Sequence, residues 1–233
     1  MIRKLIAPLF FVIFSNATLA QPIVGVGGIN IGISTEEFLN TTPIKELKSL
    51  ESLGKDKTDY ILHGEDYIER ISLPDPEKST SRSTYTPGSE IYKAKLDLGI
   101  RNLSNNLWAV EFYFYKNTLV KIVVNGRIDN ISEVLIEKYG KPKEKKDFKN
   151  IICQNGYGTK LSKTEGTEYK IWGNGNKIVA TSSFSIWNCG EGVGSQFEIS
   201  DIKTDAARSK EEQFGQKIYE SQIKKDKAKK AAF

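Results

Sequence analysis

Residues 108–124 read WAVEFYFYKNTLVKIVV, and this stretch decides the fold class. Two sets of side chains alternate along its first half: Trp108, Val110, Phe112 and Phe114, and between them Ala109, Glu111, Tyr113 and Tyr115. A period of two residues is typical of a strand with one buried face. Lys116-Asn117 can turn the chain, and Leu119–Val124 then returns as a partner strand. The sequence therefore predicts a β-hairpin whose apolar set faces the core, whereas the set with phenol hydroxyls can contact water or a partner.

Further strands are predicted on both sides of this hairpin. Upstream, Tyr60–Leu73 and Ile91–Ile100 have strand patterns, with a Pro-, Ser- and Thr-rich loop over Pro74–Ser89 between them. Downstream, Tyr169–Trp172 and Lys177–Trp187 are expected to form a second hairpin over a Gly-Asn-Gly-Asn turn. Phe197–Ile202 then closes the sheet.

Helix caps precede both groups of strands. Ser34 followed by Glu37 is a capping box, which predicts a short helix through Leu39 after a short strand over Ile29–Ile33. A second helical stretch is expected over Ile44–Leu53, where apolar residues recur at helical spacing.

The same signals occur again in the second part of the chain. Asn130 and Glu133 form another capping box, which predicts a helix over Ile131–Tyr139 that ends at Gly140. Strands in neighbouring hairpins with separate helices indicate an α+β fold with an antiparallel sheet and short helices.

The repeated order, helix and then strands, suggests the domain organisation. We expect two tandem halves, 21–126 and 127–202, followed by a charged helical tail over 203–233. One continuous sheet through both halves is the alternative.

The N-terminus has the pattern of a secretory signal peptide. Two basic residues are followed by an apolar run, Leu5–Phe14, and then by small residues up to Ala20. The run is about ten residues long, whereas crossing a bilayer takes about twenty. We therefore expect removal of residues 1–20 by a cut before Gln21, with a cut after Ala17 as the rival, and a periplasmic or secreted product.

The charge of the chain is concentrated in its tail. The formal net charge is +5, and the nine basic and five acidic residues of 203–233 contribute +4 of it. Removal of Arg3 and Lys4 with the signal peptide leaves the body near −1. The body therefore gives no indication of nucleic-acid binding. The lysines of the basic tail are able to make a weak contact with an anionic surface.

The chain has two cysteines, Cys153 and Cys189. In an oxidising compartment a lone pair most often forms one disulfide. The two residues have neither CxxC spacing nor histidines beside them, which a redox or metal pair would need. We therefore predict a structural disulfide.

No residue of the sequence is nominated for catalysis, metal binding or a cofactor. His63 is the only histidine, so nucleophilic triads and histidine-rich metal sites lack their components. A pair of carboxylates can hydrolyse glycosides without histidine. The sequence points to no particular pair, however, because Glu36 and Glu37 are explained as acids at a helix N-terminus.

Two short segments carry a family resemblance: INIGISTEEFL at Ile29–Leu39 and LIEKYGKP at Leu135–Pro142. Their sequence of a short strand, a glycine, a capped helix and a Pro-containing turn resembles BamE-like envelope lipoproteins and β-lactamase-inhibitor-protein-like modules. The acylated cysteine of the lipoproteins is missing, which argues against a lipid anchor and an assembly role. The resemblance implies a protein-binding module.

Outward-facing aromatic residues indicate where such a module would bind. Four of them are expected opposite the core faces of their strands: Tyr113, Tyr115, Trp172 and Trp187. Exposed Tyr and Trp on a rigid sheet are favoured protein-contact residues. Helices covering that face, and burying these residues, are the alternative.

The sequence therefore favours an exported, non-enzymatic module that binds another envelope protein, most specifically an inhibitor or immunity protein acting on an envelope enzyme or toxin. A periplasmic assembly or scaffold factor is the alternative. A carboxylate-dependent cell-wall hydrolase is the third hypothesis.

Overall fold

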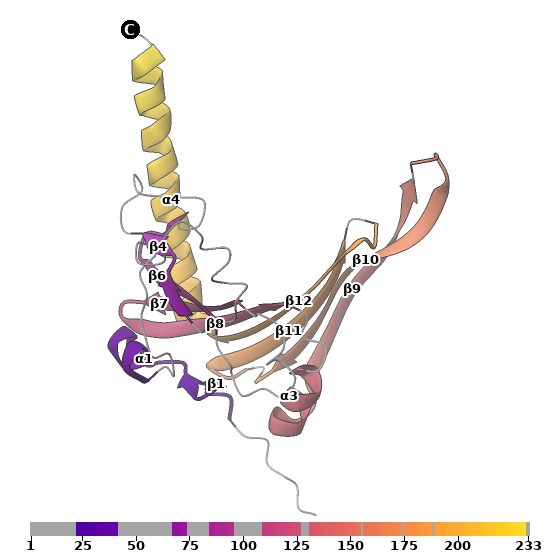
Figure 1. The fold of residues 1–233 in the computed structure, drawn as a ribbon, viewed down its shortest axis with the longest axis horizontal. Coiled ribbons are helices and arrows are strands. Elements are labelled where there is room, and N and C mark those ends of the chain that lie inside the picture. The colour runs from indigo at the N-terminus through magenta and orange to yellow at the C-terminus, as the bar shows by residue number, and fades with distance from the viewer. Residues whose placement is uncertain are drawn as a thin grey trace, which may run out of the picture.

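The computed structural model describes residues 22–41, 67–73, 84–95, 109–126, 131–154, 156–173, 175–187 and 189–231, and a curved eight-stranded sheet forms its centre (Figure 1). The strand order is β3-β6-β7-β8-β12-β11-β10-β9, and every neighbouring pair is antiparallel. The first four strands along the chain are β3 (Tyr67–Arg70), β6 (Ser89–Lys95), β7 (Ala109–Tyr115) and β8 (Thr118–Gly126). The other four are β9 (Lys143–Gln154), β10 (Lys160–Trp172), β11 (Ile178–Trp187) and β12 (Gly192–Asp201).

Smaller elements lie around this sheet. Two short strand pairs are described: antiparallel β1 (Gly25–Val26) with β2 (Ile29–Asn30), and parallel β4 (Ser72–Leu73) with β5 (Thr84–Tyr85). The helices are α1 (Thr35–Thr41), α3 (Ile131–Tyr139) and α4 (Ile202–Ala231). Together they confirm the α+β class with a mainly antiparallel sheet, and the sheet runs without a break through both expected halves.

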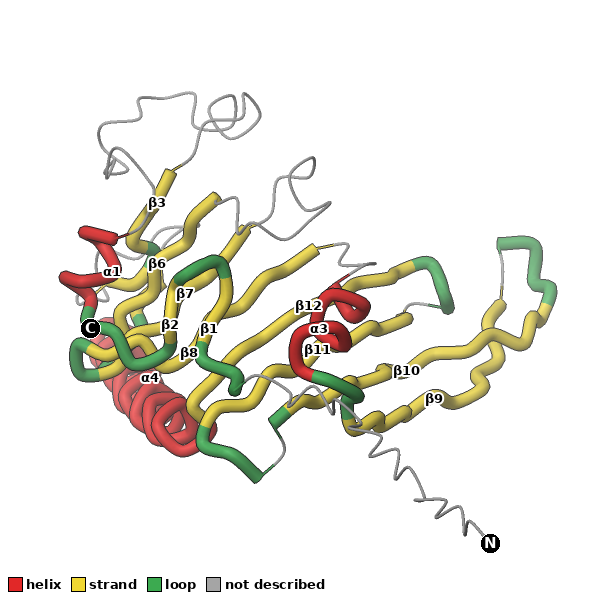
Figure 2. Tube along the Cα trace, turned by 90° about the horizontal axis from the view of Figure 1, so that it is seen from below, coloured by secondary structure: helices red, strands yellow, loops and turns green. Residues whose placement is uncertain are grey.

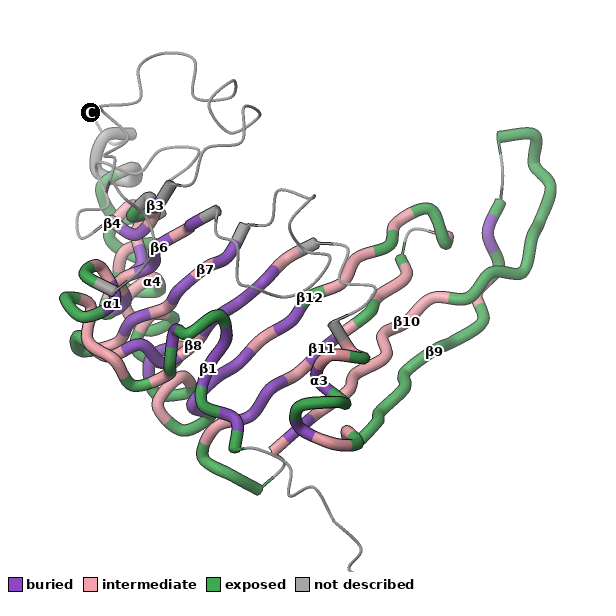
Figure 3. Tube along the Cα trace, turned by 60° about the horizontal axis from the view of Figure 1, so that its bottom comes forward, coloured by how far each residue is buried: buried purple, intermediate pink, exposed green. Residues whose placement is uncertain are grey.

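The core lies on the convex side of the sheet. Figure 2 views this side, with α1, the β1–β2 hairpin and α3 in front of the strands. Phe38 of α1 is fully buried, and its ring centroid lies 4.6 Å from that of Phe112 and 5.2 Å from that of Phe114. Strands β7, β8 and β12 supply a large share of the other core side chains, whereas β9 is exposed along most of its length (Figure 3).

The central hairpin forms as the alternating pattern predicts. Val110, Phe112 and Phe114 are fully buried. Lys116 and Asn117 both adopt positive φ angles, 50° and 60°, the turn geometry that matches the twist of a tight hairpin. The prediction for Trp108 lies outside the described residues.

Both capped helices are confirmed where the structure describes them. The Glu37 amide donates a hydrogen bond to Ser34 Oγ (3.1 Å), and α3 has the predicted bounds. Gly140 follows α3 with φ of 78°, and its amide bonds to the Ile136 carbonyl, as expected of a C′ glycine. The C-terminal tail is helical, as expected, and α4 begins at Ile202.

Several predictions fall on residues outside the described ranges. They are the signal peptide over 1–20, the helix over Ile44–Leu53, and the ends of two predicted strands, 60–66 and 96–100. The loop expected over 74–89 is described only from residue 84, where β5 and the first residue of β6 replace part of it.

Candidate functional site

The strand registers divide the side chains between two faces of the sheet. One face continues from Phe112 through Ile122 and Ile199, each paired with the next, and forms the core. On the other face, Tyr113 pairs with Lys121, which in turn pairs with Ser200. Figure 1 shows that α4 stands on this second side and that the sheet curves toward it, so we name it the concave face.

Trp172 belongs to the core side, and the prediction that it faces outward is wrong. It pairs with Ala180, which is fully buried, and the side chain of Trp172 is 2% exposed. Its indole N–H donates a hydrogen bond to the Gly140 carbonyl (2.8 Å). The residue therefore anchors the end of α3 to β10, and the hydrogen bond satisfies its one polar atom.

Tyr113 and Tyr115 lie on the concave face, but α4 packs over them. The Arg208 guanidinium carbon lies 4.8 Å from the Tyr113 ring centroid, and Tyr115 Oη donates a 2.6 Å hydrogen bond to Glu211. At this end of the concave face, a helix therefore covers the tyrosines, as the alternative expectation stated.

A polar network fixes the base of α4 to the sheet. Arg208 is buried and donates hydrogen bonds of 2.7 Å to Asp205 and to Glu212, and Glu212 also accepts a hydrogen bond from Ser89. Lys121 lies 3.8 Å from Asp205, across the junction between β8 and the helix. Charge-assisted hydrogen bonds of this kind are about twice as strong as neutral ones.

The same contacts shift the titration of Tyr113. Burial raises its pKa well above the ordinary value of 10.0, and a 2.7 Å hydrogen bond from Tyr113 Oη to Glu111 raises it further. The phenol is therefore a protonated donor throughout the neutral range and is already engaged.

Beyond α4, no described element covers the concave face, and most of the side chains near its centre are polar and uncharged. The uncharged polar residues that point into it from β8, β10, β11 and β12 are Asn125, Thr167, Tyr169, Thr181, Ser183, Ser185 and Gln196, and the carboxylates of Glu165 and Glu198 lie on the same side. Thr167 bonds to Ser185 (2.9 Å) and Gln196 to Asn125 (3.0 Å). These cross-strand bonds fix the polar groups in place before any partner binds.

Trp187 is the large aromatic residue of this open surface. It lies at the end of β11, on the same side as Ser183 and Ser185, and is 48% exposed. Its indole lies across Gly192 and Gly194 of β12: a Cβ at Gly192 would be 2.3 Å from Trp187 Nε1, and one at Gly194 2.7 Å from Cη2. The two glycines therefore leave the space in which the ring lies flat on the strand, with its other side toward solvent.

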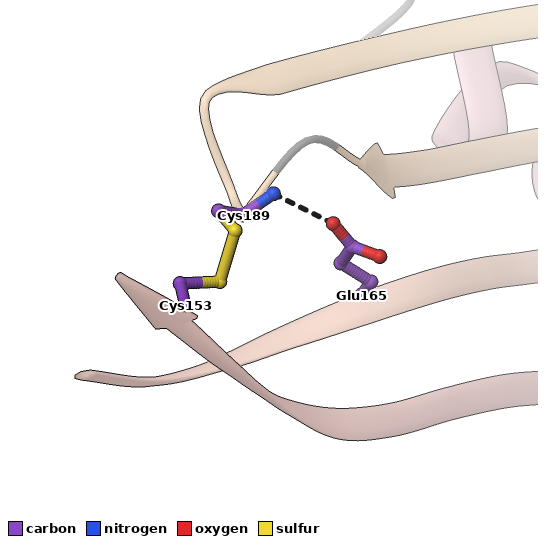
Figure 4. The surroundings of a disulfide bond; sticks show 3 residues. All are labelled: Cys153, Glu165 and Cys189. Carbon is purple, nitrogen blue, oxygen red and sulfur yellow. Dashed lines mark hydrogen bonds between the residues drawn. A yellow bond between two sulfur atoms is a disulfide. The ribbon is translucent and has the colours of Figure 1, made fainter. Parts of the chain in front are cut away.

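A disulfide holds the end of the sheet that carries Trp187. The predicted bond between Cys153 of β9 and Cys189 is present, with Cα atoms 5.9 Å apart (Figure 4). Glu165 of β10 accepts a 2.6 Å hydrogen bond from the Cys189 amide. The loop that follows Trp187 is thus bound to both strands of the β9–β10 hairpin.

The described residues offer no group of three or more His, Cys, Asp or Glu side chains that could hold a metal ion. Among the helices of the described part, none is long and apolar enough to cross a membrane. Comparison with protein-family models, curated proteins and solved structures found no match.

The support of Trp187 by Gly192 and Gly194 was not predicted, although the spacing of the two glycines indicates it. Gly192 and Gly194 are spaced by two residues, so they lie on one face of a strand. A strand face without side chains leaves room for a large ring from the neighbouring strand. Trp187 is the large aromatic residue nearest to these glycines along the chain. The register between β11 and β12 was needed to see this, because Trp187 pairs directly with Gly192.

Proposed function

We propose that this protein is an exported, non-enzymatic module that binds another protein through the open part of its concave face. The observation that carries the proposal is Trp187, half exposed and lying flat on Gly192 and Gly194. Tryptophan is among the residues that most often dominate binding energy in protein interfaces.

The surroundings of Trp187 suit a binding surface formed in advance. Its ring is supported by backbone, and the polar side chains beside it are held by cross-strand hydrogen bonds. Groups that are already ordered lose little conformational entropy on binding, so more of the contact energy appears as affinity. The disulfide restrains the loop next to Trp187 in the same way.

The specific form of the proposal is an inhibitor or immunity protein for an envelope enzyme or toxin. A curved, rigid surface with neutral hydrogen-bonding groups and one aromatic anchor suits the blocking of a projecting loop on a partner. The disulfide supports a location outside the cytoplasm, since such bonds persist mainly in oxidising compartments. That location also agrees with the signal-peptide pattern of residues 1–20.

We also propose that the sheet consists of two structural repeats, as the order of helices and strands suggests. Support comes from the order in the eight-stranded sheet: four of its strands follow α1, the other four follow α3, and the last strand of each group, β8 and β12, pair at the centre. Such a pairing would relate the two halves by a pseudo-two-fold axis.

A scaffold or assembly factor is the second candidate, and α4 favours it. This helix extends beyond the sheet as a second projecting element (Figure 1), so the molecule offers two separate surfaces. The hydrolase hypothesis has less support. Three carboxylates on the concave side, Glu111, Glu165 and Glu198, each bind a neighbouring group of the protein.

The proposal is tested by capture from envelope extract followed by mass spectrometry, with immobilised wild-type protein, Trp187→Ala and Ser183→Arg. A partner should be retained by the wild type and lost from both variants. Phe214→Ala serves as the matched control, because it removes an exposed aromatic ring from α4 instead of the concave face. Equal capture by Trp187→Ala and wild type would overturn the proposed surface. An enzyme or toxin among the captured proteins favours inhibition, whereas assembly proteins favour the scaffold role.

A further inference from the structure

The C-terminal helix has two opposite stripes, and only one of them contacts the sheet. The docked stripe consists of Arg208, Glu212, Gly215 and Tyr219, spaced by four, three and four residues. Its contacts reach Tyr113, Ser89, Pro87 and Tyr85; the Tyr219 and Tyr85 ring centroids, for example, are 5.3 Å apart. At about 100° per residue, residues spaced in this way form one face of a helix.

The second stripe is basic and exposed. Lys210, Phe214, Lys217, Ser221 and Lys224 are spaced by four, three, four and three residues, and every one of them is exposed. Ile218 and Lys225 lie beside this line and are exposed as well. From the helical period, this basic stripe lies about 170° around the helix from the docked stripe.

Acidic residues are absent from the basic stripe. By the same geometry Asp226 lies on the far side of the helix, whereas Glu220, three residues after Lys217 and four before Lys224, flanks one edge of the stripe. The carboxylate of Glu211 accepts the hydrogen bond from Tyr115. The stripe and its edge therefore present four lysines, with Glu220 as a flanking carboxylate.

Two large apolar side chains lie within this basic surface. Phe214 is 66% exposed and Ile218 is 56% exposed, one helical turn apart. Lysines alone would suit any polyanion, but exposed Phe and Ile side chains favour binding only where the contact removes them from water. The headgroup and acyl boundary of a bilayer takes up apolar side chains and attracts lysines at the same time.

We propose that the basic stripe of α4 is a contact site for a bilayer surface containing anionic phospholipid. The lysines at 210, 217, 224 and 225 would lie over the headgroups, with Phe214 and Ile218 entering the boundary below them. Because the docked stripe faces the opposite way, the helix remains attached to the sheet during the contact. The proposal is independent of the function proposed for the concave face.

The test is sedimentation of the purified protein with vesicles of phosphatidylcholine and phosphatidylglycerol in equal parts, and with vesicles of phosphatidylcholine alone. We expect binding to the anionic vesicles that weakens as salt is added. Lys217→Glu with Lys224→Glu should reduce the affinity by more than about 30-fold, since each lysine near an anionic surface contributes about 5-fold and each new carboxylate is repelled by it. Phe214→Ser with Ile218→Ser should weaken binding at every salt concentration.

Lys143→Glu with Lys145→Glu is the matched control. It makes the same change of charge at exposed positions on β9, and it should bind as the wild type does. All variants carry the same N-terminus, so that segment cannot produce a difference between them. An equal loss in this control, no preference for anionic vesicles, or full binding by the Phe214/Ile218 variant would overturn the proposal. In the last case the site would bind polyanions in general.

Discussion

Trp172 and Trp187 lie at opposite ends of the neighbouring strands β10 and β11 and on opposite faces of the sheet. Trp172 is enclosed by the core and donates its N–H to the Gly140 carbonyl. Trp187 lies on glycine backbone with one side toward solvent. One indole therefore contributes to the free energy of folding, whereas the other is placed to contribute to binding.

The stabilities of two alanine variants should separate these roles. Trp172→Ala is expected to lower the free energy of unfolding by about 3–5 kcal/mol, because it leaves a cavity and an unpaired carbonyl at the end of α3. Trp187→Ala should lower it by about 1 kcal/mol or less, since the ring is already half exposed. Urea unfolding followed by circular dichroism measures both values, and similar losses would show that Trp187 is part of the core.

Tyr113 gives a prediction about alkaline pH. Its pKa is raised in the folded protein, so the folded state keeps the phenol proton where the unfolded chain releases it. Stability from this group is therefore fully present below the unfolded pKa of about 10 and is lost as the pH rises through the folded pKa. Tyr113→Phe should lose less free energy of unfolding than the wild type between neutral and strongly alkaline pH. Identical alkaline slopes for the two proteins would contradict this.

At the scale of elements, helices and strands could be predicted from the sequence where a local side-chain pattern was compatible with only one kind of element. The 109–126 hairpin and α3 were predicted because alternation and capping are local signals. Strand β9 was missed, since an edge strand with lysines at 143, 145, 146 and 149 buries little and shows no apolar period. The side of Trp172 was misjudged because it depends on the pairing between β10 and β11, which the sequence does not display.

The packing of helix α4 on the sheet also could not be predicted from the sequence. Its charged composition predicted a helix, but the burial of Arg208 against Tyr113 depends on where the helix meets the sheet. For that reason two of the predicted contact residues, Tyr113 and Tyr115, lie under α4, and the open surface is displaced toward β10, β11 and β12.

The disulfide belongs to this scale because it joins β9 to the loop between β11 and β12. Replacing Cys153 and Cys189 together by serine should lower the free energy of unfolding by about 3.5–4 kcal/mol, as expected for closing a loop with a sequence separation of 36. Chemical denaturation of the wild type with and without a dithiol reductant gives the same comparison. Two titratable thiols in wild-type protein purified without reductant from an oxidising compartment would refute the bond.

At the scale of the whole molecule, the two sides of the curved sheet differ in what they carry. The convex side holds α1, α3 and the apolar core, and the concave side holds α4 at one end and the Trp187 surface at the other (Figure 1). The basic stripe of α4 points away from the sheet. Partner binding and surface contact would therefore use separate parts of the molecule.

The measurement that tests the central claim most directly is the affinity of the captured partner for the wild type and for Trp187→Ala, by calorimetric titration. Truncation of an aromatic anchor typically costs about 2–4 kcal/mol of binding, so we expect a loss of roughly 30- to 1,000-fold. Phe214→Ala should bind the partner as the wild type does. An unchanged affinity for Trp187→Ala, in protein that melts like the wild type, would contradict binding through the concave face.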